Sequence, residues 1–375
     1  MQTQAEDQTI LVLNSGSSSL KFGLFRRADG DEALLLSGSA EGIGRDDGSL
    51  RIKVSDGRVL EQQEPVLESQ TDVLQKLSKV LVEQSNVQPA AVGHRVVHGG
   101  PHLRTHQLLT AGVRRQLQDA VHFAPLHIPP ALALIDEASA IFSEAQHFAC
   151  FDTAFHATLQ PLAAQFPLSR RYAEAGVIRY GFHGLSYESL VTQLGTGLPS
   201  RAVFAHLGNG SSVCALRDGK SVDTSMGTRS GDLDPGVLLY LMRSEKLDAS
   251  ALETLLNRKS GLAGYTDGES DMQALEKRAK AGDANAALAL DVFATSVRKT
   301  IGAYAALLGG IDLLVFTGGI GEHSAEIRRR VCDGLAFLEL SENDPAGKVR
   351  AIHTEEEKQI ARHCRALLHQ DAGKA

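Results

Sequence analysis

Two short glycine-serine turns constrain the fold of this chain most strongly, because they look like copies of one another. The first follows the apolar run at 10–13 and reads Asn-Ser-Gly-Ser-Ser-Ser, with Lys21 close behind it. The second follows the run at 203–207 and reads Gly-Asn-Gly-Ser-Ser. A tight turn between two strands presents backbone N–H groups and hydroxyls in a concave array that binds phosphate. Its presence in each half predicts a duplicated domain that closes on one phosphorylated ligand.

Length and charge narrow the class of protein. A chain of 375 residues exceeds what one core usually supports, so two domains are expected. The formal net charge of −7 argues against nucleic acid or an anionic membrane as a partner, so locally placed basic residues must hold any anionic ligand. The cysteines have no metal or redox spacing, and no signal peptide or membrane-spanning run is evident. These features predict a cytoplasmic protein with reduced thiols.

Apolar spacing predicts alternating strands and helices along the chain. Glycines split 33–66 into short runs that are typical of a meander. The further expected elements are a helix over 71–84, a strand over 90–97, a helix over 129–141 that opens on two prolines, a strand over 147–151, and two strands within 202–216.

The longest helical pattern runs over 284–308. Its expected apolar face consists of Leu288, Val292, Val297, Ile301 and Leu308. A strand over 312–316, a glycine turn over 317–321 and a helix from about residue 322 follow, and such an arrangement binds anions at the helix N-terminus. Alternating strands and helices with an internal repeat predict an α/β protein with two like-folded halves.

Several charged side chains are candidates for chemistry. Arg95 lies inside an apolar run, where it is either a buried salt-bridge partner or a ligand for a carboxylate or phosphate. Arg229 lies in a glycine-bounded loop, which favours a functional arginine. Asp152 stands where a strand ends and either faces a cleft or caps the next helix. His183 lies between glycines, which favours a loop over a core position.

Four histidines recur at every fourth position: His94, His98, His102 and His106. On a helix they would share one face and present metal ligands. Glycines and a proline between them make a continuous helix unfavourable, so the metal hypothesis is the weaker one.

Taken together, these motifs resemble the acetate kinases over nearly the whole chain and in that family's order. The segments that carry the resemblance are 14–21, 93–100, 124–127, 151–156, 179–184, 206–212, 227–234 and 316–322. The resemblance implies two duplicated actin-like (ribonuclease H-like) domains of βββαβαβα type that flank a nucleotide cleft. It implies a first domain of 1–151 with a return helix at 358–375, and a nucleotide-binding second domain of 152–357.

The resemblance also implies an activity, which is the reversible phosphorylation of acetate by ATP, with Mg²⁺ or Mn²⁺, to acetyl phosphate and ADP. A carboxylic acid is already ionised at pH 7, so no general base is needed to form the nucleophile. Positioning and positive charge should therefore carry catalysis. The family's members are homodimers, and the resemblance implies the same here.

Site residues follow from the resemblance, position by position. Arg95 and Arg229 would grip the carboxylate and the transferring phosphoryl group. His183 would donate to the phosphoryl oxygens with His127 in support, and Asp152 would orient an arginine or a metal-bound water. The implied phosphate and nucleotide contacts are Asn14, Ser17, Ser19, Lys21, His206, Gly208, Asn209, Gly210, Gly318, Gly319, Ile320 and Gly321. The implied walls of the acyl pocket are Val97, Leu126 and Phe182, and the implied metal-linked residues are Asn14 and Glu356, the latter best aligned within 355–357.

The chain departs from the family pattern just before Arg229, where 223–227 runs straight into 228–232. The loop that is missing there carries a proline of the methyl pocket in the family. Its loss leaves a propionate- or butyrate-type kinase as an alternative, and a catalytically weak nucleotide-binding protein as an alternative of another class. Tyr187 and His323 also stand where the family has histidine and asparagine.

Overall fold

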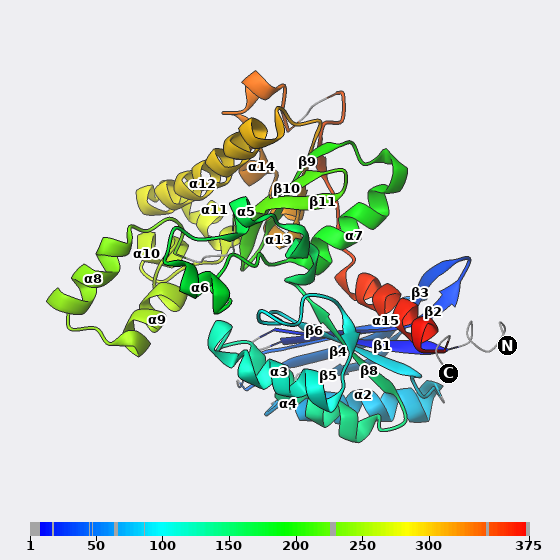
Figure 1. The fold of residues 1–375 in the computed structure, drawn as a ribbon. Coiled ribbons are helices and arrows are strands. Elements are labelled where there is room, and N and C mark those ends of the chain that lie inside the picture. The colour runs from blue at the N-terminus through cyan, green and yellow to red at the C-terminus, as the bar shows by residue number, and fades with distance from the viewer. Residues whose placement is uncertain are drawn as a thin grey trace.

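The computed structural model describes residues 8–16, 19–44, 46, 48–63, 67–85, 87–225, 230–342 and 345–372. These residues form two sheets with helices packed on them, so the predicted α/β class is confirmed (Figure 1). The strands are β1 (Thr9–Ser15), β2 (Ser19–Ala28), β3 (Asp31–Glu41), β4 (Ser49–Val54), β5 (Val59–Gln63), β6 (Ala91–Val96), β7 (Gln107–Leu108), β8 (Gln146–Phe151), β9 (Arg201–Leu207), β10 (Ser211–Arg217), β11 (Lys220–Thr224), β12 (Leu313–Thr317) and β13 (Val349–Ala351).

The helices cover the faces and ends of these sheets. They are α2 (Gln70–Ser85), α3 (Ala111–Asp119), α4 (Ile128–Ile141), α5 (Pro161–Ala164), α6 (Arg170–Glu174), α7 (Gly184–Leu194), α8 (Pro235–Ser244), α9 (Ala249–Arg258), α10 (Leu262–Tyr265), α11 (Met272–Lys280), α12 (Ala284–Leu308), α13 (Gly318–His323), α14 (Ala325–Cys332) and α15 (Glu356–Ala372). Short 3₁₀ turns are η1 (Val121–Phe123), η2 (Ala154–Thr158), η3 (Gly195–Gly197) and η4 (Ala336–Leu338).

The two sheets repeat one topology among the described residues. The larger has the order β5-β4-β3-β2-β1-β6-β8-β7, and the smaller has the order β11-β10-β9-β12-β13. In the larger sheet β1 pairs antiparallel with β2 and parallel with β6. In the smaller sheet β9 pairs antiparallel with β10 and parallel with β12. The two glycine-serine turns therefore join equivalent hairpins, as the sequence repeat predicts.

Alternation along β1 divides the first core between two layers. Leu11 and Leu13 pack toward α2 and α4, whereas Ile10 and Val12 pack toward α15. Successive side chains of a strand point to opposite faces, so a strand buried on both faces is apolar throughout. In Figure 1, α15 lies on one face of this sheet and α2, α3 and α4 lie on the other.

Helix α7 links the two halves of the molecule. Leu185 belongs to the core cluster that contains β1 and α15, while Tyr187 and Leu190 belong to the cluster that contains β9 and β10. The helix begins directly after His183, which serves as its N-cap. A rigid element between the sheets thus carries the chain from one half to the other at a candidate site residue.

The long helix α12 has the bounds that its periodicity predicts, but its expected face is partly wrong. Leu288 is 50 % exposed and Val292 is 37 % exposed, whereas Val297 and Ile301 are buried as expected. The helix is so rich in alanine that apolar residues occur all round it. Small side chains complete the face that packs on the second core, and they are Ala286, Ala294 and Ala305.

The expected turn over 317–321 is also wrong, because helix α13 begins at Gly318. The carboxylate of Glu322 accepts hydrogen bonds from the Gly318 backbone N–H at 3.0 Å and from the Thr317 hydroxyl at 3.2 Å. These bonds satisfy groups that a helix start otherwise leaves unpaired. The glycines are therefore the first turn of the helix rather than a loop before it.

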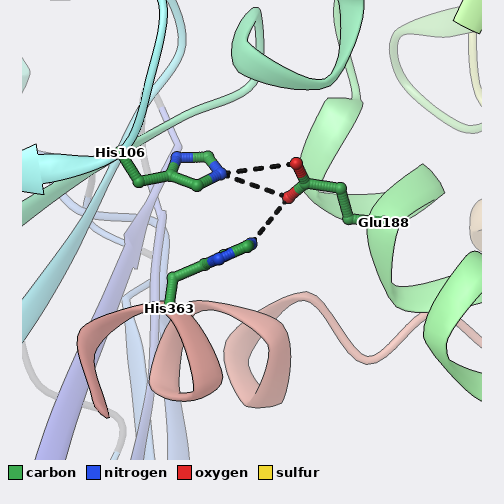
Figure 2. A group of neighbouring side chains, drawn as sticks. All are labelled: His106, Glu188 and His363. Carbon is green, nitrogen blue, oxygen red and sulfur yellow. Dashed lines mark hydrogen bonds and ion pairs between the residues drawn. The ribbon is translucent and has the colours of Figure 1, made fainter. Parts of the chain in front are cut away.

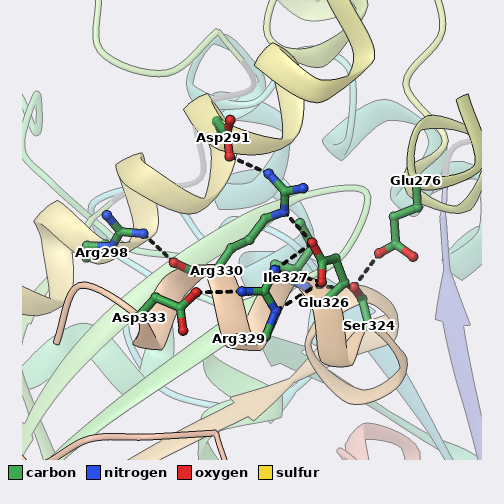
Figure 3. Close-up of polar contacts among 9 residues, drawn as sticks. All are labelled: Glu276, Asp291, Arg298, Ser324, Glu326, Ile327, Arg329, Arg330 and Asp333. Carbon is green, nitrogen blue, oxygen red and sulfur yellow. Dashed lines mark hydrogen bonds and ion pairs between the residues drawn. The ribbon is translucent and has the colours of Figure 1, made fainter. Parts of the chain in front are cut away.

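Helix α14 carries several ion pairs, and one of them joins it to α12 (Figure 3). Arg330 pairs with Glu326 on its own helix, at 2.7 Å, and with Asp291 on α12. Arg329 pairs with Asp333 at 2.6 Å. These contacts lie outside the candidate site and secure the outer layer of the second half.

None of the described helices combines the length and apolar character that crossing a bilayer requires. The four cysteines are all buried and carry no disulfide bond.

Candidate active site

Three polar side chains meet where the parallel strands of the first sheet end. Asn14 lies at the end of β1, Arg95 at the end of β6 and Asp152 directly after β8. The register pairs Leu13 with His94 in β1 and β6. Carboxyl ends of parallel strands share one edge of a sheet, which is where α/β proteins place their ligand sites.

Arg95 is the centre of this group. Its Nε and Nη2 atoms donate to Asp152 Oδ2 at 3.1 and 2.7 Å, and its Nη1 donates to Asn14 Oδ1 at 3.2 Å. Burial by itself would lower the pKa of Arg95, but the Asp152, Glu356 and Glu357 carboxylates outweigh it and raise that pKa. The guanidinium is therefore a permanent cation, and Asp152, which is 1 % exposed, fixes its orientation.

Two carboxylates of α15 complete the edge. Asn14 Nδ2 donates to Glu356 Oε2 at 3.2 Å and to Glu357 Oε1 at 2.8 Å. Carboxylate and amide oxygens are the ligands that Mg²⁺ prefers. The donor set therefore fits a divalent cation, and it includes both Glu356, the best-aligned position of the segment 355–357, and its neighbour Glu357.

On the other side of the site, His183 lies directly before the first residue of α7. Its Nδ1 lies 2.8 Å from Ser212 Oγ, and its ring stacks on His206 with centroids 4.2 Å apart. Burial, followed by the charges of His206 and Arg95, holds the pKa of His183 well below its usual value. The ring is neutral at pH 7 and can donate or accept a proton in a hydrogen bond.

His206 lies at the end of β9, and its Nδ1 is 2.9 Å from Ser186 Oγ. Burial lowers its pKa, while the Glu356 carboxylate acts in the opposite direction. The charge of Glu356, at the start of the helix α15 that packs on the first sheet, thus acts on His206, so the two edges lie within electrostatic reach of each other. The positive charge of Lys21, an exposed residue of β2, also acts on this ring.

The glycine turns of the second half adjoin these histidines. A Cβ on Gly210 would lie 3.3 Å from His183 Nε2, and one on Gly318 would lie 3.0 Å from His206 Nε2. A Cβ on Gly208 would lie 3.9 Å from the Gly319 backbone nitrogen. The turn at 208–210 and the start of α13 are therefore neighbours, and together they present backbone N–H groups of the kind that hold phosphate. Asn209 and Gly319 are exposed, and Ile320 is half-buried beside the second core.

The first turn is only partly described. The Gly16 N–H donates to the Ser19 carbonyl at 2.8 Å, which closes a tight loop between β1 and β2. The predicted contact Ser17 lies outside the described residues. Arg229 and the shortened segment at 226–229 lie outside them as well.

The predicted acyl-pocket residues differ in exposure. Val97 and Phe182 are half-buried, and Phe182 lies beside the buried His98 ring with centroids 6.0 Å apart. Leu126 is 46 % exposed, and His127 is exposed at the start of α4.

The four evenly spaced histidines do not gather into one group. His94 lies on β6 with its Nε2 2.9 Å from His147 Nδ1, and His98 Nδ1 accepts from the Gly100 N–H at 2.8 Å. His102 is exposed. These residues lie on a strand and in irregular segments rather than on one helix, so their rings do not share a face.

His106 instead joins Glu188 and His363, the only group of metal-ligand geometry found among the described residues (Figure 2). Glu188 Oε2 lies 3.3 Å from His106 Nε2 and 2.8 Å from His363 Nε2. However, His106 Nδ1 accepts the Phe151 backbone N–H at 3.0 Å, so the proton of the neutral ring must sit on Nε2. A protonated Nε2 has no lone pair for a metal, and the group is a hydrogen-bonded carboxylate that ties α7 to α15.

Paired sheets of duplicated topology, with a half-buried arginine and glycine turns at their facing edges, are the features of a phosphotransferase of actin-like fold. The chain belongs to the acetokinase family, whose model matches residues 9–362. It is 39 % identical to an acetate kinase of Methylocella silvestris, over 97 % of this chain and 98 % of that protein. It is 38 % identical to an acetate kinase of Clostridium botulinum, over 96 % of this chain and 99 % of that one.

Solved structures agree on the fold. The acetate kinase of Porphyromonas gingivalis superposes with a TM-score of 0.84 at 32 % identity, and covers 96 % of this chain and 100 % of its own. A propionate kinase from Francisella tularensis superposes with a TM-score of 0.87 at 33 % identity, with the same coverage. The expected actin-like fold is confirmed.

Proposed function

We propose that this protein is an acetate kinase, which transfers the γ-phosphoryl group of ATP reversibly to acetate and yields acetyl phosphate and ADP. One observation carries the proposal beyond family membership. The permanent cation Arg95, fixed by Asp152, lies at the same edge as the carboxylates that suit a metal and faces glycine turns that suit a nucleotide. Binding a nucleotide alone does not require such an arginine, whereas bringing two anions together does.

The reaction needs no base. A carboxylate oxygen of acetate attacks the γ-phosphorus, the bond to the β,γ-bridging oxygen breaks, and ADP leaves without net proton transfer. Acetate, with a pKa near that of a glutamate side chain, is already an anion at pH 7. The barrier is repulsion between anions and the charge on the phosphoryl group in flight, so placed positive charge and donors lower it.

In this reaction Arg95 and Arg229 hold the carboxylate and the moving phosphoryl group. His183 donates from Nε2 to a phosphoryl oxygen, because its Nδ1 is engaged with Ser212. His127 supports it from the start of α4. Asp152 is no base, since its carboxylate is committed to Arg95.

Glu356, with Asn14 beside it, would hold Mg²⁺, or Mn²⁺ in its place, together with phosphate oxygens and water. The ion supplies charge neutralisation to the β- and γ-phosphates when it is bound. The nucleotide contacts that we propose are Ser17, Ser19 and Lys21 in the first half, and His206, Gly208, Asn209, Gly210, Gly318, Gly319, Ile320 and Gly321 in the second.

Val97, Leu126 and Phe182 would line the acyl pocket. The shortened segment before Arg229 removes one wall of it, and each extra buried CH₂ contributes about 0.8 kcal/mol to binding. A propionate- or butyrate-type kinase therefore remains the second candidate, and the similarity to the Francisella propionate kinase favours it.

The domain division that we propose is 1–151 with 358–375, and 152–357. It is supported by the packing of α15 on β1. We also propose a homodimer, because α8 exposes Val237, Leu239, Tyr240 and Met242 with no buried residue on any face. Monomers rarely leave such a patch in water. The unbridged cysteines support a cytoplasmic location.

The deciding experiment traps acyl phosphate as hydroxamate, with ATP, Mg²⁺ and unbranched acids of increasing length. Acetate is expected to be the best or second-best acid. Turnover only with acids longer than propionate would replace acetate with the longer substrate. ATP binding without turnover of any acid would assign the chain to the nucleotide-binding class instead.

A further inference from the structure

A fully buried imidazole lies behind the segment that carries His183. His156 belongs to η2, which follows β8, and has 0 % exposure. Its Nε2 lies 3.0 Å from the Phe182 carbonyl oxygen, and its Nδ1 lies 2.8 Å from Ser221 Oγ. A carbonyl only accepts, so Nε2 carries the proton, and the neutral ring must accept from Ser221 at Nδ1.

The hydrogen bonds therefore run in one direction. The Cys214 thiol donates to Ser221 Oγ at 3.4 Å, Ser221 donates to His156, and His156 donates to the Phe182 carbonyl. The chain of donors starts in β10 and β11 and ends on the backbone between two residues of the candidate site. A buried polar network fixes a single arrangement of its side chains when every donor and acceptor in it is paired.

The segment that receives this bond has unusual backbone angles on both sides. Gly181 has φ +77° and His183 has φ +58°, which places both in the left-handed region. For a residue with a Cβ this conformation is unfavourable and persists only when its surroundings impose it. The His156 ring also fills the space beneath the turn, because a Cβ on Gly181 would lie 2.6 Å from its Cγ and Cδ2 atoms.

We propose that His156 is a positioning residue that pins the Gly181–His183 backbone, and so aims His183 Nε2 at the phosphate turn and sets Phe182 in the acyl pocket. This inference rests on the proposed function for its kinetic consequence, but not for its geometry. His156 itself touches neither substrate.

The pKa of His156 keeps the ring in one protonation state, in which Nε2 is the hydrogen-bond donor. Burial lowers its pKa to about 4, against the opposing effect of the bond to the Phe182 carbonyl. The charged groups that act on it are Glu188 on α7, which raises its pKa, and Arg104, which lowers it. His156 therefore stays neutral at pH values near 7, and its Nε2 remains the donor throughout.

The test compares His156→Leu, which removes the donor, with His156→Gln, which restores an amide donor near the position of Nε2. His147→Leu is the matched control, because His147 Nε2 also bonds to a carbonyl, that of Phe142, away from the site. In His156→Leu, kcat is expected to fall at least tenfold with KM for ATP within about twofold, since an ångström of misplacement costs up to about a hundredfold. His156→Gln is expected to recover most of the loss, and His147→Leu to keep the wild-type kcat.

NMR spectra of protein with isotope-labelled histidine test the inference without a measurement of turnover. The ring nitrogen resonances of His183 are expected to shift in His156→Leu and to return in His156→Gln. If these resonances do not move, or if kcat is unchanged in His156→Leu, the positioning role is overturned. If the wild-type protein does not phosphorylate acetate, the proposed function is refuted. The shift of the His183 resonances then decides the positioning role by itself.

Ser221→Ala provides a milder variant if the leucine variant does not fold. It removes the donor to His156 Nδ1 and leaves the ring in place. We expect a smaller fall in kcat and a shift of the His183 resonances in the same direction. A wild-type spectrum and kcat in this variant would show that the donor chain does not act on His183.

Discussion

The imidazole rings of His183 and His206 lie face to face, with 7° between their planes and centroids 4.2 Å apart. Each ring bonds through Nδ1 to a serine hydroxyl, Ser212 for His183 and Ser186 for His206. Burial lowers both pKa values, and the charge of His206, when that ring is protonated, lowers the pKa of His183 further. The pair is therefore a stack of two neutral rings, each of which presents its Nε2 atom to a glycine turn.

Buried neutral histidines make the stability of the protein sensitive to acid. Burial lowers the pKa of His94 to about 3 and that of His156 to about 4. Histidine in the unfolded chain has a pKa of about 6.5. Below that pH these rings are protonated in the unfolded chain but stay neutral in the folded protein. Each ring then removes about 1.4 kcal/mol of unfolding free energy per pH unit, until the folded pKa is reached.

Denaturant unfolding between pH 7 and pH 5 measures this loss. The His156→Gln variant is expected to show a shallower decline than the wild type over that range. Equal slopes in the two proteins would contradict burial as the source of the acid sensitivity.

Removal of Arg95 is expected to abolish most activity. Arg95→Ala should reduce acyl phosphate formation at least a hundredfold, or about 2.7 kcal/mol of transition-state stabilisation. The same loss is expected for Arg229→Ala. Initial rates with saturating acetate and ATP measure it.

The control for Arg95→Ala is Arg365→Ala on α15, which breaks a buried pair with Glu32 on β3, away from the site. That variant should lose stability but keep its turnover per folded molecule. Turnover within a few-fold of wild type in Arg95→Ala would remove the arginine from the mechanism.

A methyl group on Gly318 should disturb the nucleotide cradle. Gly318 has φ +76°, and a Cβ there would lie 2.7 Å from the Leu207 carbonyl oxygen. Gly318→Ala is expected to cost about 1–3 kcal/mol of strain and to raise KM for ATP. Thermal unfolding and ATP titration measure the two effects.

Gly302→Ala is the matched control, since the described residues leave open space around that position of α12. It should stabilise the protein by about 0.5–1 kcal/mol and leave KM for ATP unchanged. An unchanged KM for ATP in Gly318→Ala would show that this glycine does not shape the nucleotide site.

The exposed face of α8 is expected to hold the dimer together. In Figure 1, α8 and α9 project away from both sheets, and Tyr240 is 61 % exposed. Placing a charge there by Leu239→Glu should convert a dimer into monomers at micromolar concentration, because an unpaired buried charge is costly. Sedimentation measures the change, and Leu162→Glu, on an equally apolar but isolated exposed site of α5, should leave the dimer intact. A wild-type monomer would refute the proposal.

Local patterns predicted the elements of this fold well, because each carries its own signal. The helix over 284–308 has an aspartate cap and a glycine stop, and the structure ends it at the same residues. Spacing could not choose its buried face, since alanines are apolar on every side. The start of α13 was missed because Glu322, four residues further along, supplies the bond that allows Gly318 to begin a helix.

The site was predictable only where a motif resembled the family. Such motifs point to Asn14 and to the segment 355–357, but only the contacts across 342 and 343 residues of sequence show that both Glu356 and Glu357 meet Asn14. Ser212 and His156 are supports rather than contacts, and no pattern of spacing marks a residue that acts through a backbone carbonyl. Such residues become visible only when the donors and acceptors of the folded chain are assigned.

The bonds from Asn14 to α15 also set an order of events during synthesis. The first strand leaves the ribosome early, yet its partner on the site edge lies 342 residues further along. At about 5–20 residues per second, β1 waits roughly 17–70 s for the helix that covers it. Until α15 emerges, a nascent chain therefore holds an uncovered sheet face, and Asn14 lacks both of its carboxylate partners.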